Sequence, residues 1–385
     1  MSRLAKKGVM NIQPYQPGKP IDEVKRELLL EEVYKLASNE NSLGPSKKAL
    51  TAISKALKGL NRYPDGSCYY LKAKISEKMG LKPENFVFGN GSDELIAVII
   101  QAFMNEDENA IVADPTFLEY RLITESYGRR VKVVPNVNLS PKGRPIAGEL
   151  RGLKYDMDGI RKAIDDKTKV VFIANPDNPT GTYVSDKQIT KFLENIPDSV
   201  IVVMDEAYYD FVDAKDYPDT MRHLKDRNLI ILRTFSKAYG LAGLRVGYAL
   251  ANPELIECMN RVRQPFNVNS LAQVAAAAAI DDVAHLKRTR QTVLKGKKYL
   301  YGALDRMGLS YVPSQTNFIL VDVKRDGWEV FQRLLRHGVI VRDMKPYKLD
   351  SYIRVTIGTG KENKKFVDAM RKILKTPAGA EGEPR

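Results

Sequence analysis

Polar side chains that could carry out chemistry follow four apolar runs of the sequence. The four segments are Gly89-Asn90-Gly91-Ser92-Asp93, Asn175-Pro176-Asp177-Asn178-Pro179, Asp205-Glu206-Ala207-Tyr208 and Thr234-Phe235-Ser236-Lys237. In an open parallel sheet, ligands bind in the crevice outside the carboxyl ends of the strands. The sequence therefore predicts one crevice that combines an anion cradle, an amide, a carboxylate, a phenol and an amine.

Lys237 and Asp205 have the residue types that covalent chemistry on a carbonyl compound requires. A lysine in the crevice at the carboxyl ends of the strands can have its pKa lowered, so that its neutral amine forms a Schiff base with a carbonyl compound. Asp205 ends the apolar run VIVVM, where a charge is expected only if it meets a cation. Taken alone, Lys237 is explained as well by a solvated cation and Asp205 by a surface turn. Their order along the chain, together with the other strand ends, favours a site.

An anion site is indicated by Gly91, Ser92 and Arg245. Gly91 and Ser92 precede an amphipathic helix, whose free backbone N–H groups and positive dipole end can bind a phosphate. A capped helix alone would also explain this Gly-Ser-Asp sequence. Arg245 follows Lys237 closely enough to return to the same crevice as a second anion clamp. Asn178 lies in a turn flanked by prolines, which turn chemistry alone could explain.

The elements that must position these residues alternate in type along the chain. Short β-branched runs predict strands, which we expect at 86–89, 110–115, 170–176, 200–208, 229–236 and 245–251. Segments with helical spacing lie between most of them, and two begin with a potential Ser N-cap, Ser92 and Ser185. This alternation predicts a parallel sheet covered by helices, an α/β core.

The C-terminal third differs from this core. Residues 272–307 read as one or two helices, and residues 315–357 alternate short strands with a helix. This pattern predicts a second, smaller α+β unit, and we expect the last ten residues to be a disordered tail.

The composition excludes collagen-like, coiled-coil and wholly disordered proteins. The chain has 385 residues, of which 43% are hydrophobic and 28% charged, which is ordinary for a globular protein. No apolar stretch is long enough to span a membrane, and no apolar segment follows the cationic N-terminus, so we expect a cytoplasmic protein. Two cysteines and three histidines, all scattered, predict no metal site. The net charge of +14 fits either nucleic acid or anionic small molecules as ligands.

The complete set of motifs resembles a known family. GNGSDELI, NPDNPTG, DEAYYDF and RTFSKAYGLAGLRVGY, in this order, are similar to the fold-type I pyridoxal-phosphate aminotransferases, specifically the histidinol-phosphate aminotransferases. SKAYGLAGLR marks the superfamily, and LASNEN, GNGSDE and DEAYYDF narrow it to this branch. Further segments (PYQPGKPIDEVKRE, RYPDG, RQPFNVNSLAQ, PSQTNFILVD and YIRVTIGT) extend the resemblance to roughly residues 11–375.

The resemblance implies a fold and its domains. A large cofactor-binding domain would hold a mostly parallel sheet between helices, beside a smaller α+β domain. The implied division is an N-terminal arm with part of the small domain at 1–40, the large domain at 41–272, the small domain at 273–375 and the tail at 376–385.

The resemblance also assigns roles around the cofactor, pyridoxal 5'-phosphate. Lys237 would hold it as a Schiff base and move the proton at the substrate α-carbon. Asp205 would keep the pyridine nitrogen protonated, so that the ring accepts electrons, and Tyr208 and Asn178 would bind the ring hydroxyl oxygen. Phe117 would stack on the ring face; without the resemblance, it would be read as a core residue. The implied phosphate ligands are Gly91, Ser92, Asp93, Ser236 and Arg245.

Substrate recognition and a partner subunit follow from the same resemblance. Arg342 and Arg354 would bind the anionic end of both substrates bidentately, and Asn39 would also contact substrate. Tyr63 would reach the cofactor phosphate of the other chain of a homodimer, and Tyr15 would cover the other chain's substrate. Without the resemblance, the tyrosines would be read as packing residues and the arginines as members of surface ion pairs.

The implied reaction transfers an amino group from glutamate to imidazole acetol phosphate, which gives histidinol phosphate and 2-oxoglutarate. Aromatic amino acid transamination and, less favoured, threonine-phosphate decarboxylation are alternatives on the same scaffold. A nucleic-acid binder without catalysis is disfavoured, because it would not need the complete cofactor set.

Three features depart from the family or do not bear on this function. Ser42 stands where the family leads us to expect proline, and residues 136–152 form a longer connection than expected, which could be a surface excursion or alter access to the site. The basic residues between 287 and 298 have no aromatic platform beside them, so we interpret them as a solvated helix face rather than a nucleic-acid site.

Overall fold

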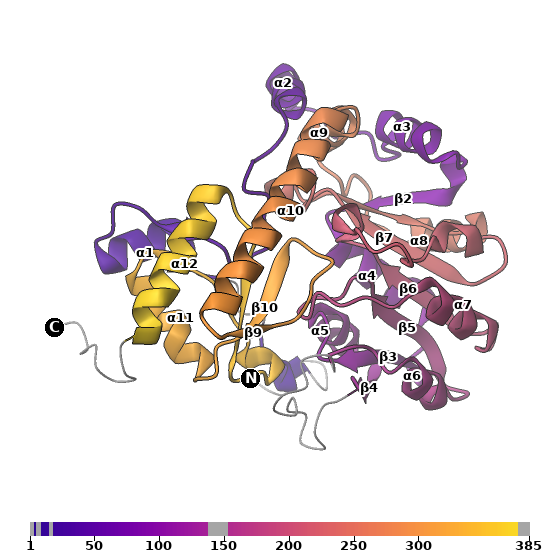
Figure 1. Cartoon of the computed structure of the whole chain (residues 1–385). Helices are drawn as coiled ribbons and strands as arrows, with labels where there is room; N and C mark the ends of the chain where they lie inside the picture. Colours follow the sequence, from indigo (N-terminus) through magenta and orange to yellow (C-terminus); the bar gives the residue numbers. More distant parts are fainter. Residues whose placement is uncertain (1–3, 5–8, 15–17, 138–152, 376–385) are drawn as a thin grey trace.

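The main sheet of the protein has seven strands in the order β2-β8-β7-β6-β5-β3-β4. The computed structural model describes residues 4, 9–14, 18–137 and 153–375 (Figure 1). The strands of the main sheet are β2 (Phe86–Gly89), β3 (Asn109–Asp114), β4 (Arg130–Pro135), β5 (Thr168–Ala174), β6 (Ile201–Asp205), β7 (Leu229–Thr234) and β8 (Gly247–Leu250).

The expectation of a mostly parallel sheet is confirmed, with β8 as an exception. Strands β4, β3, β5, β6 and β7 pair in parallel, whereas β8 runs antiparallel to both of its neighbours, β7 and β2. A parallel strand needs a long crossover, usually a helix. The chain between β7 and β8 contains only the 3-10 turn Ala242–Leu244, so β8 returns as the antiparallel neighbour of β7. The alternation of strands and helices along the sequence does not predict this reversal.

Helices cover both faces of this sheet (Figure 1). Alternate residues of each strand enter different hydrophobic clusters, which explains why the strands are continuous apolar runs. One face packs against α4 (Ser92–Phe103), α5 (Glu119–Ser126) and α8 (Pro253–Val262). The other packs against α2 (Lys47–Ala56), α3 (Tyr69–Met79), α6 (Met157–Ala163), α7 (Asp186–Glu194) and α9 (Ser270–Ile280).

The two helix starts predicted from serines have different outcomes. Ser185 caps α7 in a capping box with Gln188. The prediction for Ser92 was wrong by one residue, because Gly91 is the N-cap of α4 and Ser92 its first helical residue. Gly91 has a φ of 85°, a conformation that glycine adopts without strain, so the chain turns sharply into α4 there.

The smaller unit contains an antiparallel sheet of order β12-β13-β10-β9 and a two-stranded parallel sheet of β1 and β11. Because β1 belongs to the N-terminal segment, both ends of the chain contribute to this unit. Its strands are β1 (Tyr34–Lys35), β9 (Ser310–Tyr311), β10 (Phe318–Asp322), β11 (Val339–Ile340), β12 (Arg342–Asp343) and β13 (Tyr352–Thr356). Its helices are α1 (Ile21–Leu28), α10 (Val283–Arg306), α11 (Gly327–Arg336) and α12 (Gly360–Lys375).

Short 3-10 turns complete the described elements, at Val9–Asn11, Leu57–Gly59, Pro83–Asn85, Tyr209–Phe211, Thr220–His223 and Lys345–Tyr347. Within the part of the chain that the structure describes, no helix combines the length and apolar character needed to cross a bilayer.

Candidate functional site

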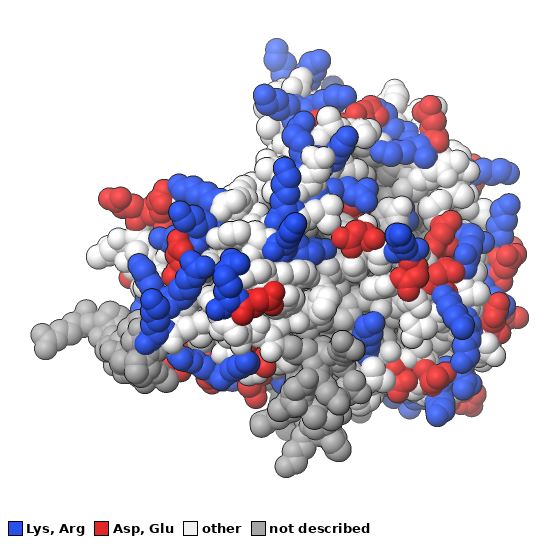
Figure 2. Space-filling model, viewed as in Figure 1, with Lys and Arg blue, Asp and Glu red and all other residues white. Residues whose placement is uncertain are grey.

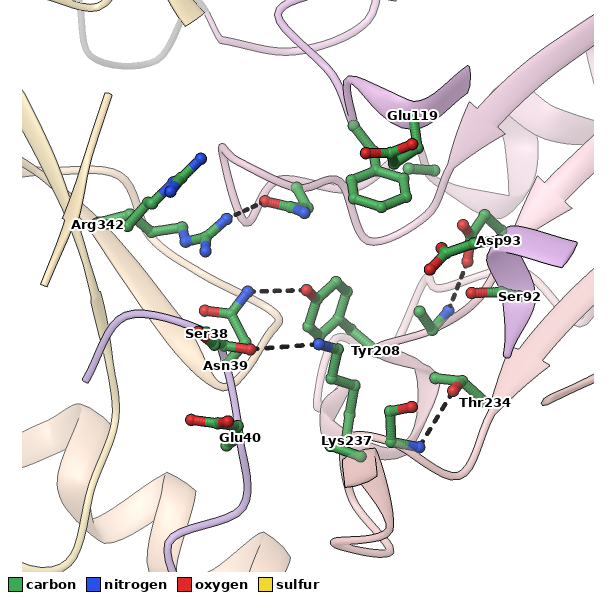
Figure 3. A pocket seen from close by; sticks show the side chains of 18 of the residues that line it. Ser38, Asn39, Glu40, Ser92, Asp93, Glu119, Tyr208, Thr234, Lys237 and Arg342 are labelled. Carbon is green, nitrogen blue, oxygen red and sulfur yellow. Dashed lines mark hydrogen bonds between the residues drawn. The ribbon is translucent and has the colours of Figure 1, made fainter. Parts of the chain in front are cut away.

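A cavity of about 530 Å³ lies where the carboxyl ends of β5, β6 and β7 face β12 and β13 of the smaller unit. Figure 3 shows its side chains, which come from both units and from the segment around Asn39. The predicted site residues that line it are Asn39, Ser92, Asp93, Phe117, Asn178, Asp205, Tyr208, Ser236, Lys237, Arg245, Arg342 and Arg354. The structure therefore brings together residues that lie far apart in the sequence.

Lys237 has the surroundings of a reactive amine. Its Nζ is 3.4 Å from the carbonyl oxygen of Ser38 and 5.9 Å from the centre of the Tyr208 ring. Burial lowers the pKa of Lys237 to about 8, and the nearby Arg354 cation contributes in the same direction. About one amine in ten is therefore neutral at pH 7, far more than for an unperturbed lysine, and the neutral amine is the form that attacks a carbonyl carbon.

Asp205 is buried at the end of β6, where two donors bind its carboxylate. The backbone N–H of Ala207 donates to Oδ1 at 3.0 Å, and the hydroxyl of Tyr120 donates to Oδ2 at 2.7 Å. Burial raises the pKa of Asp205 to about 6, although both hydrogen bonds oppose this rise. At pH 7 the cavity therefore presents a carboxylate that can pair with a cationic ligand group.

Tyr120 was missed by the sequence analysis. It is fully buried in α5, and its ring stacks on Phe172 of β5 with 4.9 Å between the ring centres. The ring also meets Phe117 edge to face at 5.4 Å. No local signal in PTFLEY indicates this role, because the contact with Asp205 depends on how α5 packs over the sheet.

Tyr208 and Asn39 form a buried pair at the other side of the cavity. The amide Nδ2 of Asn39 donates to the Tyr208 hydroxyl at 2.8 Å, and burial raises the pKa of that phenol. Thr356 of β13 holds Asn39 in place by accepting a hydrogen bond from its backbone N–H at 2.9 Å. The Tyr208 hydroxyl is therefore neutral and oriented at pH 7.

The residues predicted to form an anion site lie close together at the start of α4. A Cβ atom on Gly91 would lie 2.6 Å from Nη2 of Arg245, so only glycine allows the guanidinium this close. Arg245 donates from the same nitrogen to Asp93 at 3.0 Å. The free N–H groups at the start of α4 and the arginine border the same end of the cavity, together with Ser236. This combination suits a phosphate group.

Arg342 and Arg354 lie directly opposite each other in the pairing of β12 with β13. Arg354 donates to the side-chain oxygen of Asn178 and, at 2.9 Å, to the carbonyl oxygen of Ala37. Its Nε is buried and has no hydrogen-bond partner among the described residues. The two guanidinium groups make this end of the cavity suitable for a second anionic group.

The turn that carries Asn178 is supported by a buried network that sequence reasoning also missed. Asp177 accepts hydrogen bonds from the hydroxyls of Thr116 at 2.7 Å, Tyr155 at 2.9 Å and Thr180 at 2.8 Å. Burial raises the pKa of Asp177 to about 6 despite these donors. The network fixes the position of the Asn178 side chain beside the cavity.

A buried ion pair lies next to Asp205 in the sheet. Arg233 of β7 contacts Glu206 with 2.7 Å between Nη2 and Oε2, and its guanidinium lies 4.0 Å from the centre of the Tyr209 ring. The hydroxyl of Thr220 also donates to Glu206. Glu206 is 2% exposed and Arg233 is 9% exposed, so neither charge can be solvated if the other is removed.

Replacing Glu206 with alanine is therefore expected to lower the free energy of unfolding by about 3–5 kcal/mol, because it leaves the Arg233 charge buried and unpaired. Urea denaturation at pH 7 measures this change. Glu257→Ala is the matched control, since Glu257 forms an exposed ion pair with Arg261 on α8 and should cost at most about 1 kcal/mol. Equal losses for the two variants would contradict the prediction.

Of the predicted site residues, Tyr63 is not at this cavity. Tyr63 is 83% exposed, lies outside the cavity and stacks on Phe266 with 4.9 Å between the ring centres. Tyr15 lies outside the described residues, as do most of the 136–152 connection and the tail at 376–385.

The basic run between 287 and 298 lies on α10, where Figure 2 shows Lys and Arg side chains gathered on the surface. The interpretation as a solvated helix face was wrong for Lys297. This residue is 7% exposed and donates from Nζ to the carbonyl oxygen of Ser314 at 2.7 Å. Among the described residues, no cluster of three or more potential metal ligands is present.

Comparison with known proteins adds three findings. The family model for aminotransferase class I and II matches residues 31–370. A protein of Moorella thermoacetica named histidinol-phosphate aminotransferase is 47% identical over 371 residues, which cover 96% of this chain and 92% of the relative. A protein of the same name from Caldicellulosiruptor saccharolyticus is 44% identical, with 95% of this chain and 99% of the relative covered.

A solved structure is similar over almost the same length. The crystal structure of histidinol-phosphate aminotransferase from Sinorhizobium meliloti in complex with pyridoxal-5'-phosphate superposes with a TM-score of 0.85. The two chains are 25% identical, and the match covers 96% of this chain and 97% of the other.

Proposed function

Because the chain belongs to the class I and II aminotransferases, and within them to the histidinol-phosphate aminotransferase family, we propose that it moves an amino group between L-glutamate and imidazole acetol phosphate. The products are 2-oxoglutarate and L-histidinol phosphate. The observation that carries this proposal is the common cavity, in which a lysine of lowered pKa lies between a phosphate cradle and a pair of arginines.

The cavity residues fit pyridoxal 5'-phosphate, the cofactor of this family. When bound, it supplies a carbonyl carbon that takes up the amino group and a ring that accepts electrons. Gly91 leaves the space that a phosphate cradle needs beside Arg245. The residues that would hold the phosphate are Gly91, Ser92, Asp93, Ser236 and Arg245, those for the ring are Phe117, Asn178, Asp205 and Tyr208, and Lys237 would bind the carbonyl carbon.

Lys237 is the residue that would move the proton. With a pKa of about 8, its Nζ can accept the proton of the substrate α-carbon and then return it, since the two forms of the amine are close in free energy near neutral pH. Asp205 would hold the proton on the pyridine nitrogen. Asn178 and Tyr208 would orient the hydroxyl group of the cofactor ring, and Asn39 would hold the Tyr208 hydroxyl in place for this contact.

Arg342 and Arg354 would bind an anionic group that each substrate carries close to its reacting carbon. This group is the phosphate of histidinol phosphate and the α-carboxylate of glutamate. A guanidinium binds either anion through two parallel hydrogen bonds, so one pocket can serve both half-reactions. Asn39 also lines the cavity, held by Thr356 of the same strand as Arg354, and would complete the contact with substrate.

The fall of kcat at low pH, the acid limb of the pH profile, tests whether the ionised carboxylate of Asp205 is needed for activity. Tyr120→Phe removes a donor that stabilises the ionised carboxylate, so the pKa of Asp205 should rise further above about 6. Because the ionised form is the active one, the decline of kcat on acidification should begin at higher pH in the variant. A pH profile of kcat measures this shift.

The matched control is Tyr155→Phe, which removes a buried hydroxyl from Asp177 rather than from Asp205. It should leave the acid limb in place even if it lowers stability. An unchanged limb in Tyr120→Phe would show that Tyr120 does not act on Asp205.

The proposal includes a homodimer with shared sites, in a cytoplasmic enzyme of amino-acid biosynthesis. Support comes from the exposed position of Tyr63 beside Phe266, outside its own chain's cavity. Other large apolar side chains are exposed in the neighbouring segments, namely Leu57, Leu60, Tyr69 and Tyr70. Tyr63 would serve the cofactor phosphate of the opposite subunit, and Tyr15 would cover its substrate.

Subunit mixing tests this arrangement. Tyr63→Ala should weaken cofactor binding in both sites, and Lys237→Ala should inactivate both. In a mixed dimer of the two variants, one site has both defects and the other has neither, so about half of the unsubstituted activity should return. No recovery on mixing, with mixed dimers demonstrated by mass spectrometry, would contradict a shared site.

A single-turnover experiment tests the proposed reaction as a whole. Purified protein with pyridoxal phosphate is mixed separately with histidinol phosphate, glutamate, phenylalanine and threonine phosphate, and the absorbance of the bound cofactor is followed. Rapid conversion by the first two, with phenylalanine much slower, is the expected result. Faster conversion by phenylalanine would indicate aromatic transamination, and carbon dioxide from threonine phosphate would indicate decarboxylation. No absorbance from bound cofactor would overturn the proposal.

A further inference from the structure

Glu119 places a carboxylate without a partner at the cavity. It is the first residue of α5 and lies on the same side of the cavity as Asp93 (Figure 3). Other acids of the cavity have donors: Asp93 binds Arg245, and Glu40 binds Lys35 at 2.9 Å. Among the described residues, the half-buried Glu119 carboxylate makes neither a hydrogen bond nor an ion pair.

This position is unfavourable for the free protein. Burial raises the pKa of Glu119, and the neighbouring Asp93 carboxylate raises it further. A partly buried polar group that lacks a protein partner has lost solvation without compensation. Glu119 is therefore placed to accept a hydrogen bond from something that enters the cavity.

The proposed substrate has one group that the other residues leave without a contact. Arg342 and Arg354 suit its phosphate, and Lys237 lies where its amino-bearing carbon must react. The remaining group is the imidazole ring, which carries an N–H donor in each of its protonation states. The side chain of phenylalanine has no donor.

We propose that Glu119 accepts a hydrogen bond from the imidazole N–H of histidinol phosphate, and that this contact makes the enzyme prefer histidinol phosphate to phenylalanine. This inference rests on the proposed function and assigns a specificity-determining residue to it. Binding sites built to pair with a substrate N–H discriminate strongly against analogues that lack it, because the site's own polar group then stays unpaired.

Two replacements of Glu119, by leucine and by glutamine, should differ in how the enzyme handles glutamate, the other substrate. Its side-chain carboxylate and that of Glu119 repel each other unless one of them is protonated. A glutamine at this position can accept from an imidazole N–H and can also donate to a carboxylate. Leucine has a similar size and can do neither.

The test compares Glu119→Leu and Glu119→Gln in the enzyme saturated with pyridoxal phosphate. Glu119→Leu should lower kcat/KM for histidinol phosphate by about 10- to 100-fold, the range for a lost hydrogen bond to a charged group. The value for phenylalanine should stay the same or rise, and that for glutamate should not fall. Glu119→Gln should stay within a few fold of the unsubstituted enzyme for histidinol phosphate. Glu125→Gln is the control, since Glu125 lies on the same helix in an ion pair with Arg121.

A binding measurement separates recognition from catalysis. Histidinol phosphate labelled with ¹⁵N in the ring is titrated into Lys237→Ala and into Lys237→Ala combined with Glu119→Leu. The double variant should bind more weakly by the same factor, and the ring nitrogen signals of the bound ligand should lose the shift caused by the hydrogen bond.

Two results would overturn the inference. Equal losses for histidinol phosphate and phenylalanine in Glu119→Leu would mean that the residue only supports α5, and unchanged kinetics with histidinol phosphate would mean that no contact exists. Failure of the proposed function is seen separately, because the unsubstituted enzyme would then not convert histidinol phosphate.

Discussion

Replacing Lys237 with alanine should lower the rate of amino transfer by at least about 10³-fold while the fold is retained. The loss is large because the same amine would bind the cofactor and move the proton at the substrate α-carbon. Its surroundings prepare it for both tasks, since burial and Arg354 lower its pKa to about 8. Steady-state rates with glutamate and with histidinol phosphate, on protein whose circular dichroism spectrum is unchanged, measure the effect.

The control for this variant is Lys297→Met. Lys297 is also a buried lysine of lowered pKa, but it lies in α10, where its Nζ donates to Ser314 away from the cavity. This substitution should cost stability and leave the rate per folded molecule unchanged. Substantial residual transamination in Lys237→Ala would exclude the mechanism, whatever the outcome for the control.

Replacing Arg354 with alanine should raise KM for glutamate and for histidinol phosphate together, with a loss in kcat/KM of about 10²- to 10³-fold. Removing one partner of a buried charged pair costs about 2–5 kcal/mol, which corresponds to losses of this size. The effect should extend to both substrates because the residue would bind their shared anionic end. The substitution also removes the hydrogen bonds that Arg354 donates to the side-chain oxygen of Asn178 and to the carbonyl oxygen of Ala37.

Arg354→Lys should recover only part of this loss, because an ammonium cannot make two parallel hydrogen bonds to one anion. Arg371→Ala on α12, where Arg371 forms an exposed ion pair with Asp368, is the control and should have no effect on KM. A loss confined to one substrate would show that the two anionic groups bind at different places.

The sequence predicted the convergence of the site well, for a reason of topology. Asn178 and Lys237 follow β5 and β7, and Asp205 is the last residue of β6. These three strands are parallel neighbours, so their carboxyl ends share one edge of the sheet. Any chain with this order of strands brings those residues together. The pairing of Arg342 with Arg354 follows equally from two adjacent antiparallel strands.

The residues that were missed depend on packing rather than on strand order. Tyr120 is 85 residues away from Asp205 in the sequence, and its contact arises only because α5 lies over the end of β6. Glu206 and Arg233 pair across neighbouring strands, yet each alone resembles an ordinary charged residue at a strand end. Lys297 was misread because its neighbours on α10 are solvated. The burial of this single lysine depends on the loop that carries Ser314.

The burial of Asp205 also has a consequence for the stability of the protein. Folding raises its pKa from 3.8 to about 6, so the folded chain binds this proton more tightly than the unfolded chain. Ionisation of Asp205 therefore opposes folding by about 3 kcal/mol above pH 6, and this cost disappears as the pH falls through 6 toward 4. A cation that pairs with Asp205 only in the folded chain removes the same cost. The protein should thus be harder to unfold with its cofactor bound than without it, most of all at the pH where it works.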